Sequence, residues 1–170
     1  FLADYEVIRI WVDLSEAEIN AYNESREVYL RFLRDRGIYM SAGGWQRFIR
    51  EASLCKEGRK AFQSYQTSKR ISHGAESKIR ALGNLLARER GRKILIFTND
   101  NSTAYRISRE FLIPCITHQT DLKERRRVLS AFSSGVLPVL VTSRVLNEGV
   151  DIPEAEIGIV LSGTGTVREH

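Results

Sequence analysis

Short apolar runs alternate with amphipathic stretches through the second half of this chain, and this pattern constrains the fold most. The runs predict strands, and the stretches between them have the spacing of helices. A strand that is apolar at every position is buried on both faces, which is typical of a parallel sheet covered by helices. The pattern therefore predicts an α/β fold, with strands at Lys93–Thr98, Pro114–Thr117, Pro138–Thr142 and Ile157–Ser162 and helices at 76–91, Ser102–Phe111 and Leu122–Phe132.

The first part of the chain has a different pattern. Glu6–Val12 alternates well enough to predict a short strand, and Ser15 and Glu18 then have the spacing of a capping box for a helix that ends before Gly37. Aromatic residues at helical spacing follow, and we expect Trp45 and Phe48 to belong to a core rather than to a base-stacking platform. A mainly helical subdomain is therefore expected before the sheet, with the boundary near 72–76.

The positive charge is concentrated in the middle of the chain. The net charge is +5, but residues 26–93 hold seventeen basic and six acidic side chains. Residues 1–25 carry one basic and six acidic side chains, and residues 94–170 carry eight and nine. A basic excess in one block favours a polyanionic partner, nucleic acid above all, over solubility alone.

Other features exclude several classes of protein. No apolar run approaches the roughly 20 residues that a membrane helix needs, so no membrane association is expected. No leader peptide is visible, and a chain running from Phe1 to His170 is interpreted as a fragment. Cys55 and Cys115 are isolated, which indicates reduced structural thiols in a cytoplasmic protein and no zinc site.

Three polar loops follow predicted strands, at the edge where open α/β sheets bind ligands. The loop at 98–102 runs into a helix N-terminus, which suits a phosphate, although Asn101 or Ser102 as an ordinary N-cap explains it equally well. His118 follows the next strand and is more easily explained as a hydrogen-bonded structural residue than as a base. The third loop begins after Thr142 and contains Gly149 and Asp151, which suit close backbone approach and a hydroxyl or cationic partner.

The sequence lacks the motifs with which a single domain binds the phosphates of a nucleotide by itself. There is no Gly-x-x-x-x-Gly-Lys-Ser/Thr and no Gly-x-Gly-x-x-Gly. This chain would therefore contact only one side of a bound nucleotide, and another domain would supply the phosphate-binding loop.

These segments together resemble the second RecA-like domain of a superfamily-two helicase. KILIFTND resembles motif IV with its strand, and VLVTSRVLNEGVDIP resembles motif V. The N-terminal segment, FLIPCITHQT and the terminal SGTGTVREH narrow the resemblance to prokaryotic, chiefly archaeal, XPB-type DNA repair helicases. That family implies a RecA-like parallel sheet with helices on both faces, preceded by a helical thumb. The implied domains are a lead-in strand at 1–14, a thumb-like insert at 15–72, and a RecA-like domain at 73–170 that stops before motif VI.

The resemblance also implies roles for individual residues. Gly149 and Asp151 would approach ATP, bound with Mg mainly by an absent N-terminal RecA-like domain. The Walker motifs and the arginine-bearing motif VI lie outside this sequence, so the fragment alone is expected to be inactive. Expected partners are DNA, the protein's own N-terminal helicase domain and a repair nuclease. Contacts to the DNA backbone are implied for Thr98, Asn99, Asn101, Thr142 and Ser143, and for Arg34, Arg36, Arg47 and Arg50 in the thumb.

Two alternatives remain open from the sequence. One is a DNA-binding or scaffold module whose helicase-like domain is vestigial. The other is an independent Rossmann-like enzyme with a small-molecule pocket.

Overall fold

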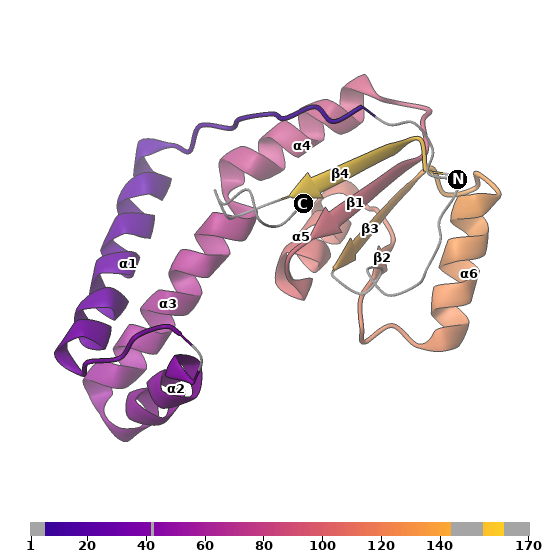
Figure 1. The fold of residues 1–170 in the computed structure, drawn as a ribbon. Coiled ribbons are helices and arrows are strands. Elements are labelled where there is room, and N and C mark those ends of the chain that lie inside the picture. The colour runs from indigo at the N-terminus through magenta and orange to yellow at the C-terminus, as the bar shows by residue number, and fades with distance from the viewer. Residues whose placement is uncertain (1–5, 42, 144–154, 162–170) are drawn as a thin grey trace.

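The chain forms an α/β unit beside a helical subdomain (Figure 1), and the computed structural model describes residues 6–41, 43–143 and 155–161. Parallel strands with helices on both faces confirm the predicted fold class. None of the helices in these ranges is long and apolar enough to cross a membrane. The elements are α1 (Glu16–Asp35), α2 (Gly44–Leu54), α3 (Lys56–Gly74), α4 (Glu76–Arg88), β1 (Ile94–Thr98), α5 (Asn101–Phe111), β2 (Cys115–Ile116), α6 (Leu122–Ser133), β3 (Val139–Ser143) and β4 (Ile157–Leu161).

The sheet has four parallel strands in the order β2-β3-β1-β4. Strand β1 is central, and its side chains alternate between two separate cores. Ile94 and Ile96 face α4 and α5, whereas Leu95 and Phe97 face the side covered by α6. Burial on both sides explains why every position of the ILIFT strand except its last is apolar.

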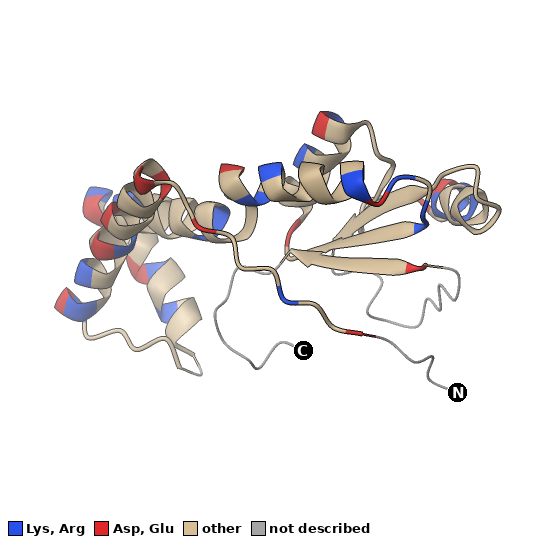
Figure 2. Ribbon diagram, turned by 90° about the horizontal axis from the view of Figure 1, so that it is seen from above, with Lys and Arg blue, Asp and Glu red and all other residues tan. Residues whose placement is uncertain are grey.

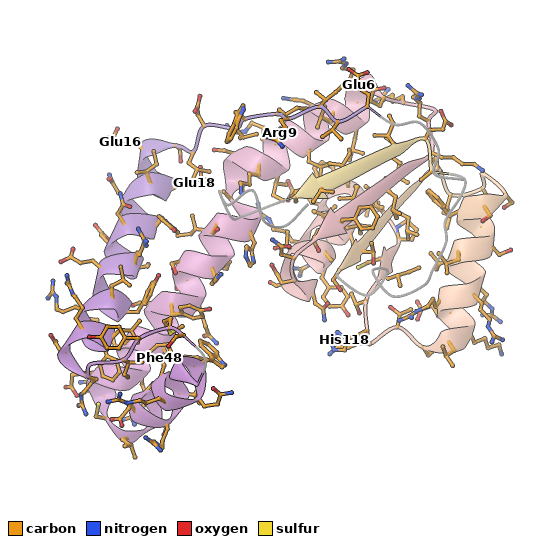
Figure 3. All side chains as sticks on the ribbon, viewed as in Figure 1. Glu6, Arg9, Glu16, Glu18, Phe48 and His118 are labelled. Carbon is orange, nitrogen blue, oxygen red and sulfur yellow. The ribbon has the colours of Figure 1, made fainter. Side chains whose placement is uncertain are left out.

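The helical subdomain consists of α1, α2 and α3, which pack around a separate core. Phe48 is completely buried at its centre, and the Trp45 ring packs against Phe48 and Tyr65. Gly58 allows α3 to approach α2, because a Cβ at this position would lie 2.6 Å from the Cα of Ala52. Figure 3 shows Phe48 between the three helices, which confirms that it is a core residue.

The predicted strand at Glu6–Val12 is wrong. Residues 6–15 form neither helix nor strand, and they pair with no strand of the described sheet. Val7 and Ile8 are largely exposed, and the Trp11 side chain is 87% exposed. Alternating polarity predicts a strand only where a partner strand supplies its hydrogen bonds, and no such partner is present in the described ranges. The lead-in strand expected within 1–14 is therefore not formed at residues 6–14.

The helix starts show which polar side chains act as caps. Ser15 and Glu18 form the predicted capping box at α1. Asp121 caps α6 by accepting from the backbone N–H groups of Lys123 and Glu124. The cap of α5 is Asp100, so the sequence-based expectation of Asn101 or Ser102 is corrected by one residue.

Glu18 joins the start of α1 to the start of α4. Its carboxylate accepts hydrogen bonds from the backbone N–H of Ser15 at 2.9 Å and from the Ser77 hydroxyl at 2.6 Å. The helices α3 and α4 meet at Ala75, within the expected boundary at 72–76. Burial raises the pKa of Glu18, but the hydrogen bonds from Ser77 and Ser15 outweigh it and lower the pKa from 4.5 to about 2.

We expect Glu18→Ala to lower the free energy of unfolding by about 1 kcal/mol at pH 7, the usual size of a lost helix cap. Because the folded-state pKa lies below the unfolded value, the contribution of Glu18 is complete above pH 4.5 and is lost as the pH falls towards 2. Urea unfolding of both proteins at pH 7 and pH 3 should show the difference shrinking at low pH.

Glu16→Ala is the matched control. Glu16 lies in the same first turn but makes no hydrogen bond to α4 in the described structure. An equal loss of stability in both variants at both pH values would contradict the special role of Glu18.

Candidate nucleic-acid interface

Asn101 joins the carboxyl ends of three neighbouring strands. It is the first residue of α5, directly after β1 and its loop. Its Oδ1 accepts a hydrogen bond from Ser143 Oγ at the end of β3, at 2.5 Å. Its Nδ2 lies 2.9 Å from Nδ1 of His118, two residues after β2. One amide side chain therefore connects β1, β2 and β3 at the edge where ligands bind in such sheets.

His118 is exposed at this edge (Figure 3). With Nδ2 of Asn101 as donor, Nδ1 of His118 must accept, so the ring proton lies on Nε2. No described residue bonds Nε2, which leaves its N–H able to donate to a solvent-side acceptor such as a phosphate oxygen. The hydrogen-bonded role expected for His118 from the sequence is thus observed.

The hydroxyl groups expected to touch DNA are mostly used inside the protein. Thr142 is completely buried, and its Oγ1 donates to the Ser143 carbonyl at 2.8 Å. Thr98 is buried too, and its Oγ1 lies 2.9 Å from the Asp100 carbonyl and 3.3 Å from the Thr142 carbonyl. Ser143 is almost fully buried beneath Asn101. Asn99 and Asn101 are half-buried, so they are more accessible than these hydroxyls.

The loop after β2 is held by hydrogen bonds around Thr117. The Thr117 hydroxyl lies 2.9 Å from the Tyr105 hydroxyl, which also donates to Gln119 at 3.0 Å. Arg125 in the first turn of α6 donates to the Thr117 carbonyl at 3.1 Å. These contacts fix the backbone that presents His118.

Asp100 stabilises the same edge through hydrogen bonds to α3 and α5. It accepts from the Thr103 backbone N–H at 2.8 Å and lies 3.1 Å from Nδ1 of His73 at the end of α3. The hydrogen bond from His73 is the main cause that lowers the pKa of Asp100 to about 2, against burial, which raises it; bonds from Thr103 add to the lowering. Asp100 is therefore ionised at neutral pH, and Nδ1 of His73 must carry the proton.

The four arginines predicted to contact DNA from the helical subdomain differ in their surroundings. Arg47 donates to the carbonyls of Arg36 and Gly37 at the end of α1, at 2.9 and 3.1 Å. Arg36 lies over the Phe32 ring and 3.4 Å from the Glu51 carboxylate. The Arg50 side chain is 71% exposed, and its ion pair with the Glu51 carboxylate is long, at 3.9 Å.

Arg34 is also exposed, and its side chain has no partner in the described part of the chain. Arg34 and Arg50 are therefore the two that are available to a partner. Their contact with DNA, like that of Arg36 and Arg47, stays a prediction.

Charges lie on the helices rather than on the strands (Figure 2). Lys and Arg are spread over the helical subdomain and α4, with acidic residues between them. Most of the basic block at 26–93 is thus displayed on helices beside the sheet.

Gly149 and Asp151, the residues expected to approach ATP, lie outside the described residues. Within the described ranges, no group of three or more His, Cys, Asp or Glu side chains could hold a metal ion. Cys55 caps α3 by accepting from the Gly58 backbone N–H, and burial raises the pKa of the Cys115 thiol to about 11, as for inert packed thiols.

Sequence reasoning missed Asp100 and His73 at this edge, and it missed the contact between Asn101 and His118. Asp100 carried a signal, since an Asp three residues before Thr103 at a helix start is a usual cap. The contact of Asn101 with His118 joins residues on two loops and has no sequence signal. The contact of His73 with Asp100 spans 27 positions and has none either.

Comparison with known proteins defines the class. Residues 77–169 match the family model described as the helicase conserved C-terminal domain. The match covers more than half of the chain, so the chain belongs to this family of helicase C-terminal domains.

Curated relatives place it more closely. It is 36% identical to the DNA 3'-5' translocase XPB2 of Sulfurisphaera tokodaii over 170 residues, covering 99% of this chain and 39% of the relative. It is 32% identical to the DNA 3'-5' helicase XPB of Kineococcus radiotolerans over 101 residues, covering 59% of this chain and 18% of the relative. These similarities confirm the XPB-type resemblance. The chain spans less than half the length of either relative.

A solved structure supports the fold. The C-terminal domain of a Sulfolobus solfataricus SWI2/SNF2 ATPase superposes with a TM-score of 0.64 at 16% identity, over 91% of this chain and 70% of that one. At this identity the likeness shows the fold alone.

The two thumb arginines Arg47 and Arg50 should behave differently when replaced. We expect Arg47→Ala to lower the free energy of unfolding by about 1 kcal/mol, because two carbonyl groups lose their donor. Arg50→Ala should change it by less than about 0.5 kcal/mol, as for ordinary surface substitutions. Thermal and urea unfolding measure both; a larger loss in Arg50→Ala would contradict the assignment of Arg47 as the structural one.

Proposed function

We propose that this chain is the C-terminal part of an ATP-dependent DNA helicase or translocase of the XPB type, which opens duplex DNA during repair. The chain supplies contacts to the DNA backbone and one side of an ATP site shared with an N-terminal helicase domain. The curated relatives named above are described as a DNA 3'-5' translocase and a DNA 3'-5' helicase, which supports this activity.

The observation that carries the proposal is the edge organised by Asn101. Polar groups from β1, β2 and β3 meet there, with the Nε2–H of His118 facing solvent. The half-buried Asn99 adds a further side-chain amide to this edge. Donors in a row suit a sugar–phosphate backbone, whose recognition positions a protein without reading sequence.

The buried hydroxyls act in this proposal mainly through the backbone. The Thr98 hydroxyl bonds carbonyl groups of Asp100, in the loop after β1, and of Thr142 in β3, and the Thr142 hydroxyl bonds the Ser143 carbonyl at the end of β3. These bonds fix the backbone where both loops begin. Ser143 orients Asn101 by donating to its Oδ1. Thr98, Thr142 and Ser143 thus shape the edge, and Asn99, Asn101 and His118 meet the DNA.

ATP with Mg would supply the free energy that drives movement along DNA. In this chain Gly149 and Asp151 would approach the nucleotide, and their segment begins directly after β3, whose last residue is Ser143. The same strand end therefore leads both to the DNA edge and to the ATP side. This shared origin suits an element that couples the two sites.

We also propose that the protein is prokaryotic and cytoplasmic and that it acts with its N-terminal helicase domain and with a repair nuclease. The alternative of a non-catalytic scaffold with a vestigial helicase domain is not favoured, because the curated relatives are described as a translocase and a helicase.

Binding of the 170-residue chain to duplex DNA should depend strongly on salt, since each neutralised phosphate contributes a slope of about −0.9 to log K against log salt. Arg50→Ala should reduce the magnitude of that slope by about one. Asn101→Ala should weaken binding about fivefold without changing the slope, because it removes neutral hydrogen bonds. Fluorescence anisotropy at several salt concentrations measures all three.

Asn84→Ala is the matched control, since Asn84 is exposed on α4 away from the strand ends and bonds no described residue. Its affinity should equal that of the unmodified chain. Binding that does not vary with salt would sink the nucleic-acid proposal, and an unchanged affinity in Asn101→Ala would remove the strand-end edge from it.

ATP hydrolysis should require the N-terminal helicase domain as well. We expect the 170-residue chain alone to show no DNA-stimulated hydrolysis, whereas the complete protein should show it. Asp151→Ala in the complete protein should lower the DNA-stimulated rate by at least about tenfold, the cost of one lost charge-assisted hydrogen bond. Phosphate release assays measure the rate, and a normal rate in that variant would refute the role of Asp151.

A further inference from the structure

The helix α3 spans the distance between the helical subdomain and the strand-end edge. Figure 1 shows it running from its contacts with α1 and α2 to the start of α4, beside the sheet. Its first part packs in the subdomain core through Ala61 and Phe62. Its last residues, His73 and Gly74, lie against the first turn of α5. One continuous helix thus contacts both parts of the molecule.

His73 contacts the α5 cap directly. Its Nδ1 donates to Oδ2 of Asp100 at 3.1 Å, and its side chain is only 14% exposed. The same Asp100 carboxylate accepts from the backbone N–H and the hydroxyl of Thr103, at 2.8 and 3.0 Å. The position of Asp100 is therefore set jointly by α3 and by α5.

Neighbouring contacts prevent α3 from sliding over α5. A Cβ on Gly74 would lie 3.0 Å from Thr103 Oγ1, so the end of α3 packs closely against the Thr103 side chain of α5 at this glycine. Arg106 donates to the Gly74 carbonyl at 3.0 Å and forms an ion pair with Glu76 at the start of α4. The end of α3 is therefore held against α5 at several points.

Asp100 and Asn101 are consecutive, and their side chains have different tasks. Asp100 faces α3, whereas Asn101 faces the strand ends and bonds Ser143 and His118. A shift of Asp100 displaces the backbone of Asn101, because the two residues share a peptide bond. Such a shift would disturb the hydrogen bond that Asn101 Oδ1 accepts from Ser143 Oγ.

We propose that His73 is a positioning residue for the nucleic-acid edge: through Asp100 it fixes Asn101, and so couples the helical subdomain to the DNA-contacting loops. The inference rests on the proposed function and deepens it. The exposed arginines of the helical subdomain and the DNA-contacting residues at the strand ends are then held in a fixed position relative to each other. Loss of the His73 contact loosens that relation, although it removes none of the side chains that touch DNA.

A double-mutant cycle tests the coupling in the 170-residue chain. His73→Ala should weaken duplex binding about two- to tenfold, the range of one hydrogen bond's contribution. In the Asn101→Ala background the same substitution should have no further effect on affinity, because its action passes through Asn101. A residue that merely stabilises the fold would lower affinity equally in both backgrounds.

Two further variants separate positioning from stability. His73→Asn places an amide Nδ2 near the position of Nδ1 and should restore most of the affinity. Ser68→Ala removes a hydrogen bond to the Tyr65 carbonyl at a buried position of the same helix, more than one helical turn before His73. It should lower the melting temperature and leave affinity unchanged. If His73→Ala does not fold, His73→Asn and His73→Gln are compared instead, since the longer amide should fail to restore binding.

The outcomes distinguish the two proposals. Weaker binding in Asn101→Ala with unchanged binding in His73→Ala, or with additive effects in the double variant, overturns the coupling and leaves the proposed function intact. Equal affinity in His73→Asn and His73→Gln also overturns it. Unchanged binding in Asn101→Ala overturns the strand-end interface and the coupling together. Non-additive loss with recovery in His73→Asn supports the coupling.

Discussion

Burial of β1 on both faces is the constraint on which the rest of the structure depends. Ile94 and Ile96 pack against α4 and α5, and Leu95 and Phe97 pack on the side covered by α6. The strand therefore cannot slide or turn without exposing one of the two cores. Its parallel neighbours are therefore held in register, and their carboxyl ends meet at one edge. The polar residues that follow those ends come together for this reason, although they are distant in the sequence.

The edge is organised in two layers. Buried hydroxyls of Thr98 and Thr142 satisfy carbonyl groups where the strands stop, which avoids the cost of unpaired buried polar groups. Above them Asn101 links Ser143 with His118 and leaves one N–H of His118 towards solvent. Buried hydrogen bonds that fix the strand ends and accessible donors on their surface suit binding of a DNA backbone without recognition of bases.

Two carboxylates connect the helical subdomain to the α/β unit, and both are held ionised. Glu18 bonds the starts of α1 and α4, and Asp100 bonds the end of α3 to the start of α5. Each carboxylate lies at a helix N-terminus, where the helix dipole also favours a negative charge. The two units are thus joined by polar contacts at helix ends, which are directional, in addition to apolar packing.

The sequence by itself determined the strands of the sheet and most helix boundaries, because periodicity and caps act over neighbouring residues, and its motifs resembled those of the RecA-like class. The resemblance to motif IV also indicated Asn101. The sequence failed at Glu6–Val12, where alternation had no partner strand, and it could not assign tasks within the loops. Only the tertiary structure decided that Thr142 is buried, that Arg47 binds carbonyls of α1, and that His73 reaches Asp100. These contacts join residues far apart in the chain, and their geometry follows from how helices pack on the sheet.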